Sequence, residues 1–190
     1  DSPNAEAIPG EYVDPEFTWT GFAGRGRVIL VNTDLLAPEE YPASLDDLLD
    51  PKWPANQIGI AYPLFGTTAT HAAALYALWG QDTAQGFFEQ LQGRGIQVVD
   101  GNSVVRDMVA DGQLAFGLTD TDDACSAVQR GAPVEIIFPD QGENGIGTLI
   151  VPNTVALIAG GPNPQNGKQF IDFILSSETA GALIEAGWSQ

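Results

Sequence analysis

Three short apolar runs in this sequence each end in a cluster of small polar residues, and a helix-like segment follows each cluster. The runs span 58–61, 96–99 and 114–118, and the clusters span 66–68, 101–103 and 119–123. Alternation of strand and helix predicts an α/β sheet whose strands run mostly parallel. The carboxyl ends of such strands lie at one edge of the sheet, where ligands bind. We therefore expect the three polar clusters to share one pocket mouth.

The apolar patterns predict strands and helices along the whole chain. Strands are expected at 27–32, 58–61, 96–99, 114–118 and 133–138, with a further bent strand within 146–158, and helices at 69–79, 81–92, 104–111, 122–130, 165–175 and 178–186. The expected helix caps are Thr67 or Thr68, Asn102 or Ser103, Asp120 or Thr121, and Ser176 or Ser177. The helix at 165–175 is expected to bury Phe170, Ile171, Phe173, Ile174 and Leu175.

The charge of the chain restricts its partners. Its net charge is −18, from 25 acidic and 7 basic residues. Binding to nucleic acid or to anionic membranes requires basic residues, so the sequence argues against both. The apolar stretches are too short to span a bilayer. No charged and apolar leader opens the sequence, so we expect any export signal to have been removed or never to have been present.

Neither the single cysteine nor the single histidine predicts catalysis. Cys125 has no second cysteine to pair with, and we expect it to be a buried, inert thiol. His71 lies in an alanine-rich segment, and a structural role there is expected more often than a ligand role. No Ser–His–Asp or Cys–His signature supports hydrolysis.

The order of several segments resembles a known family. These segments are 26–33, 41–53, 101–103, 151–158, 162–164 and 170–178. In this order they are similar to solute-binding proteins of ABC importers, of the iron(III) type with the type II periplasmic binding fold. The resemblance implies two lobes with a mixed, mostly parallel sheet flanked by helices. Lobe two would be 34–150, and 1–33 with 151–190 would be a partial lobe one with crossing strands, without its N-terminal part.

The chain departs from this family at the site that binds iron. The family's iron-binding members have two adjacent tyrosines where this chain has Asp122 and Asp123, and an anion-binding asparagine where it has Asp120. Carboxylates also bind divalent cations, so Asp122 and Asp123 are candidate metal ligands. An acid at position 120 would repel phosphate. We therefore expect a cation, an amine or a hydroxyl-rich neutral solute, and a metal ion such as iron is the one candidate for a bound cofactor.

Taken together, the residues and the resemblance predict a non-catalytic solute-binding component of an ABC importer. We expect it to be periplasmic or extracellular, to hold its ligand in an interlobe cleft and to deliver it to a membrane permease. The predicted ligand contacts are Thr67, Thr68, Asn102, Ser103, Asp120, Thr121, Asp122 and Asp123. The acids could instead only cap a helix, although capping does not need three of them within four residues.

Two other functions stay open at this point. One is a Mg²⁺-dependent phosphohydrolase that uses Asp120, Asp122 and Asp123, although the base nearest to them in the sequence after this cluster is Arg130. The other is an interaction lobe with no ligand.

Overall fold

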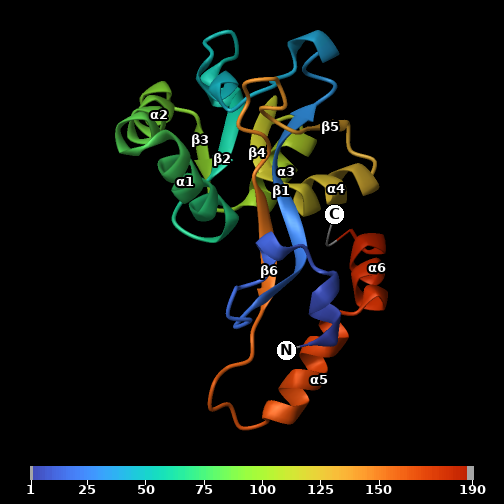
Figure 1. Ribbon diagram of the computed structural model, residues 1–190. Helices are drawn as coiled ribbons and strands as arrows, with labels where there is room; N and C mark the ends of the chain where they lie inside the picture. The colour runs from blue at the N-terminus through green and yellow to red at the C-terminus, as the bar shows by residue number, and fades with distance from the viewer. Residues whose placement is uncertain (1, 188–190) are drawn as a thin grey trace. The chain divides into compact units, whose positions relative to one another are not determined.

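The structure is a computed structural model that describes residues 2–187 (Figure 1). The chain divides into two compact units. One consists of Asp1–Arg25 and Ile150–Gln190, and the other is Gly26–Leu149. Within the described range, no helix is long and apolar enough to cross a membrane.

The central sheet is mixed, and its strand order is β3–β2–β4–β1–β5, with β6 also paired to β1. The strands are β1 (Thr20–Asn32), β2 (Ile58–Ala61), β3 (Gln97–Val99), β4 (Phe116–Asp120), β5 (Val134–Ile137) and β6 (Ile150–Val155). β2 is parallel to β3 and β4, whereas β1 is antiparallel to β4 and β5. Along the order β3 to β5, only β1 therefore runs against the others, and the prediction of a mixed, mostly parallel sheet is confirmed.

Helices cover both faces of the sheet. Val28 and Leu30 of β1 pack with α3 (Asn102–Ala110) and α4 (Thr121–Gln129), through a cluster that includes Val105 and Ala124. Ile29 and Val31 point to the other face, where α1 (Gly66–Trp79) and α2 (Gln81–Arg94) contribute to a second cluster. Burial on both faces explains why this part of β1 is a continuous apolar run rather than an alternating pattern.

The unit that holds the chain's two ends differs from the sequence prediction in one respect. Its helices are α5 (Pro164–Ile174) and α6 (Ser177–Glu185), and Ser176 caps α6 as predicted, because its Oγ accepts from the N–H of Thr179 at 3.2 Å. The expectation that Phe170 and Phe173 are buried is wrong, because they are 58% and 59% exposed. Residues three apart share one helix face, and no described residue covers this one.

The remaining short elements are single 3₁₀ turns that join these strands and helices. They are η1 (Pro3–Ala7), η2 (Gly10–Tyr12), η3 (Pro38–Glu40), η4 (Asp46–Leu49) and η5 (Ala55–Gln57). Two of these turns, η1 and η2, precede the start of β1.

The contact of α3 with the sheet depends on a glycine. A Cβ atom at Gly117 of β4 would overlap Cγ1 of Val105 and lie 2.8 Å from the carbonyl oxygen of Gly59. We expect Gly117→Ala to lower the free energy of unfolding by about 1–3 kcal/mol, because overpacking forces shifts in a dense core. Urea unfolding measures this change.

Gly86→Ala in α2 is the matched control, because no atom lies within 4 Å of its added methyl group. This control should be neutral or stabilising by about 0.5–1 kcal/mol, as alanine favours helix. Equal unfolding midpoints for the two variants would show that α3 is free to shift away from the sheet.

Candidate functional site

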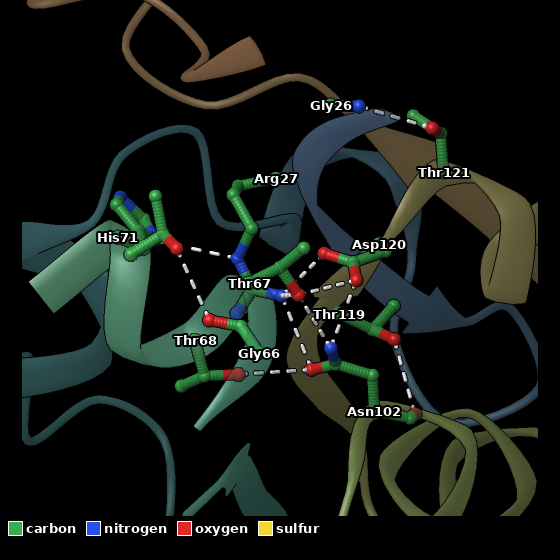
Figure 2. A network of polar contacts seen from close by, with 11 residues as sticks. Gly26, Arg27, Gly66, Thr67, Thr68, His71, Asn102, Thr119, Asp120 and Thr121 are labelled. Atoms are coloured by element: carbon green, nitrogen blue, oxygen red, sulfur yellow. Dashed lines mark hydrogen bonds and ion pairs between the residues drawn. The ribbon is translucent and has the colours of Figure 1, made fainter. Parts of the chain in front are cut away.

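The three turns that precede α1, α3 and α4 meet at one place in the Gly26–Leu149 unit (Figure 2). Thr68 donates from Oγ1 to Oδ1 of Asn102 at 3.2 Å, and Asn102 donates from Nδ2 to Oδ2 of Asp120 at 2.9 Å. Thr119 also donates from Oγ1 to the carbonyl oxygen of Asn102 at 3.1 Å. The structure thus brings together the three clusters that the strand–helix order predicts to be neighbours.

The predicted caps of α1 and α3 are wrong, because their N-cap residues are Phe65 and Gly101. Asp120, one of the two caps predicted for α4, is its N-cap residue. None of the three makes a side-chain hydrogen bond to an N–H group of its own helix. Thr67, Thr68, Asn102 and Ser103 lie inside the first turns, and most of their side chains bond to one another instead. The first-turn N–H groups of a helix have no partner within the helix, so uncapped starts offer them to an anion.

Arg27 is the residue that sequence reasoning missed. It is fully buried, and the antiparallel register of β1 and β4 places it opposite Asp120. Its Nη1 donates to Oδ1 of Asp120 at 2.5 Å and to Oδ1 of Asn102 at 3.1 Å, and its Nε donates to Nδ1 of His71 at 3.4 Å. The sequence indicates it only as a charged residue directly before the buried apolar run 28–31. That Asp120 is its partner follows from the pairing of two strands almost a hundred residues apart.

Asp120 is held by protein groups on both of its oxygens. Oδ1 accepts from Arg27, and Oδ2 accepts from Oγ1 of Thr67 at 2.5 Å and from Nδ2 of Asn102 at 2.9 Å. The side chain of Asp120 is almost fully buried, and Arg27 neutralises its charge. The expectation that this acid would repel a phosphate assumed an unpaired carboxylate, whereas the structure pairs Asp120 with Arg27.

Burial controls the ionisation of Arg27 and His71. It lowers the pKa of Arg27, and the nearby carboxylate of Asp120 opposes this shift. Burial, and then the positive charge of Arg27, lower the pKa of His71 to about 4. His71 is therefore neutral near pH 7, as its role as acceptor of the Arg27 N–H requires.

The other predicted site residues have different surroundings. Thr121 is buried, and its Oγ1 accepts from the N–H of Gly26 at 3.0 Å, whereas Ser103 is exposed. Asp122 and Asp123 are half-buried. Asp123 accepts from Nη1 of Arg106 at 3.0 Å, so a base does lie beside the acidic cluster.

The acidic cluster has a geometry that could hold a metal ion. One carboxylate oxygen each from Asp120, Asp122 and Asp123 lies within 4.8 Å of the others. Hard oxygen donors of this kind suit divalent cations and iron. However, Asp120 and Asp123 already accept from Arg27 and Arg106, so a metal ion would compete with two bases for their oxygens.

Comparison with known proteins identifies the family. The model of the family described as "Bacterial extracellular solute-binding protein" matches residues 1–188. The chain belongs to this family. A curated relative, the "Putative 2-aminoethylphosphonate-binding periplasmic protein" of Salmonella typhi, is 27% identical over 85% of this chain and 48% of its own length.

Solved structures share the fold. Iron-bound HitA from Pseudomonas aeruginosa superposes with a TM-score of 0.86 at 22% identity, over 97% of this chain and 60% of HitA. AfuA from Actinobacillus pleuropneumoniae, with fructose-6-phosphate bound, has a TM-score of 0.78 at 28% identity, over 99% of this chain and 60% of AfuA. The predicted type II periplasmic binding fold is thus confirmed, and the chain spans about half the length of the curated relative above.

These findings bear on the alternatives left open by the sequence. The family and the relatives named above are described as binding proteins, so the phosphohydrolase alternative gains no support from them. The roles of the individual site residues in binding stay predictions.

His71 should make the stability of the protein depend on pH. The pKa of His71 is about 4 in the folded protein, whereas an unperturbed histidine has a pKa of 6.5. Between these two pH values the unfolded chain therefore binds more protons than the folded protein. The stability that neutral His71 provides is complete above about pH 6.5 and is lost progressively as the pH falls from 6.5 to 4, by about 3 kcal/mol in total. The difference between the wild type and His71→Gln in urea unfolding at pH 7 and pH 4.5 isolates this contribution.

The same residue can be followed directly, because the chain has one histidine and therefore one imidazole signal in an NMR titration. A midpoint near 6.5 for the folded protein would contradict the burial of His71 against Arg27.

Proposed function

We propose that this chain is the solute-binding component of an ABC importer and that its solute carries an anionic group, such as a phosphonate, phosphate or carboxylate. The observation that carries the proposal is the meeting of three helix N-termini, those of α1, α3 and α4, without side-chain caps. Each helix N-terminus carries a partial positive charge and N–H groups that favour an anion. The proposed export and delivery to a membrane permease follow from the family description.

The charge of the site supports an anionic ligand. Arg27 compensates Asp120, and Arg106 compensates Asp123, although the chain as a whole is strongly acidic. Asn102 and Thr67 are half-buried, lie in the first turns of α3 and α1, and are bonded to each other beside the buried ion pair. We expect their polar atoms to contact a small solute. Asp122 lies beside them in the acidic cluster, where it suits the ammonium group of a zwitterion.

The relatives point to the same chemistry. One is described as binding 2-aminoethylphosphonate, and another was solved with fructose-6-phosphate. Both compounds carry a tetrahedral anionic phosphorus group, which three helix N-termini can surround. The amino group of the first compound matches the acidic side of the site, and the hydroxyl groups of the second match carboxylate acceptors.

A metal ion is the second candidate ligand. It is favoured by the close carboxylate oxygens of Asp120, Asp122 and Asp123. It ranks below an anion because two of these three acids are engaged by arginines.

A ligand panel separates the two candidates. We expect 2-aminoethylphosphonate, fructose 6-phosphate or inorganic phosphate to raise the melting temperature, because a ligand that binds only the folded state stabilises it by about 2.7 kcal/mol at one hundred times its Kd. Differential scanning fluorimetry measures the shift. A shift with Mn²⁺, Ca²⁺ or ferric citrate and with none of the anions would establish the second candidate instead.

Asn102→Asp tests the place of binding. It adds a negative charge to the start of α3 beside Asp120, and we expect the affinity for the anion to fall at least tenfold, or about 1.4 kcal/mol. Calorimetric titration of the folded variant measures the change. Asn144→Asp is the matched control, because it adds the same charge at an exposed loop position of the same unit and should leave the affinity unchanged. Tighter binding of a divalent cation by Asn102→Asp, with the anion unaffected, would place the metal ion at this site.

A further inference from the structure

Arg27 holds a position that joins all three parts of the site. Its Nη1 bonds to side chains of α1, α3 and the end of β4, through Thr67 at 3.5 Å, Asn102 at 3.1 Å and Asp120 at 2.5 Å. Figure 2 shows these contacts radiating from one guanidinium group. Nη1 has two hydrogens, so its close bonds go to Asp120 and Asn102, and Thr67 lies at the outer limit of hydrogen-bond distance. Nε donates in a second direction, to His71, and the single nitrogen of a lysine ammonium cannot reproduce these fixed directions.

The guanidinium is not fully used by the fold. Its Nη2 is buried and has no hydrogen-bond partner among the described residues of the protein. A buried donor without a partner is unfavourable, so it is rarely retained where a structural role alone would satisfy the group. The ion pair with Asp120 needs only Nη1, and Nη2 is left for an acceptor that these residues do not supply.

We propose that Arg27 is a specificity-determining, positioning residue, which sets the charge class of the solute by neutralising Asp120 beneath the helix starts. The inference rests on the proposed anionic ligand and adds the reason why a site with three acids accepts an anion. With Arg27 in place, Asp120 adds no net charge to the site. Without Arg27, Asp120 would lose the charge that compensates it, in a cluster where its carboxylate oxygen lies within 4.8 Å of those of Asp122 and Asp123, and the site would attract cations.

The neighbouring basic residues have other roles, so Arg27 is the group that compensates the charge of Asp120. His71 contacts Arg27 but is neutral near pH 7, so it does not add positive charge. Arg106 serves Asp123 and also Asp107, and Arg130 bonds to Asp107 rather than to the cluster. Arg27 is thus the base that forms the buried ion pair with Asp120.

A charge cycle tests the inference with four proteins: the wild type, Arg27→Met, Asp120→Asn and the double variant. Calorimetry measures the affinity of each for 2-aminoethylphosphonate, inorganic phosphate, Mn²⁺ and Ca²⁺. Arg27→Met should weaken anion binding at least a hundredfold and should gain binding of a divalent cation. Asp120→Asn leaves Arg27 uncompensated and should tighten anion binding about tenfold, and the double variant should return to within about tenfold of the wild type.

A second comparison and one further variant keep the test decisive. If Arg27→Met does not fold because Asp120 is left buried and unpaired, the comparison of Asp120→Asn with the double variant still measures the effect of Arg27. Arg27→Lys keeps the charge but loses the planar geometry, so it should keep the preference for anions at lower affinity. A purely structural arginine would predict equal ratios of anion to cation affinity in every folded variant.

The outcomes distinguish this inference from the function on which it rests. A wild-type protein that binds none of the anions overturns the proposed function and this inference with it. A wild-type protein that binds an anion, with Asp120→Asn and the double variant within twofold of it, overturns this inference alone.

Discussion

The buried ion pair between Arg27 and Asp120 is the interaction on which the organisation of the site depends. It links the long antiparallel strand β1 to the end of β4, and its hydrogen bonds extend to the starts of α1 and α3. Burying two charges has a large desolvation penalty, so such a pair is weak evidence for stability but can fix one arrangement of its neighbours. Here every oxygen of Asp120 has a donor, which makes the arrangement of the three turns specific.

The sequence predicted the elements and their order because these depend on local patterns. Apolar runs such as 28–31, and the switch to helical spacing after each polar cluster, are visible without any tertiary information. The meeting of the three turns was also predictable, since parallel strands send their carboxyl ends to one edge. The starts of α1 and α3 were placed three and two residues late, because Thr67, Thr68 and Asn102 were assigned to caps, whereas their side chains bond to tertiary partners.

The chemistry of the site could not be read in the same way. The partner of Asp120 is Arg27, which is 93 residues away in the chain and reaches it only through the pairing of β1 with β4, and we propose that this partner decides whether Asp120 repels an anion. Likewise Phe170 and Phe173 fit the apolar stripe of α5, yet what covers a helix face is a property of the tertiary structure. Local pattern thus identifies which residues are special, and long-range pairing decides what charge and access they have.

The glycines at positions 59 and 117 have a consequence for recognition. Gly117 leaves room for the side chain of Val105 of α3 and Gly59 leaves room for that of Leu114, so α3 packs closely on the sheet, and its first residue, Asn102, is also tied to Thr119. The polar groups at this helix start are therefore held by the central sheet. If the proposed solute binds there, it meets donors already fixed in place, so little ordering entropy remains to be lost.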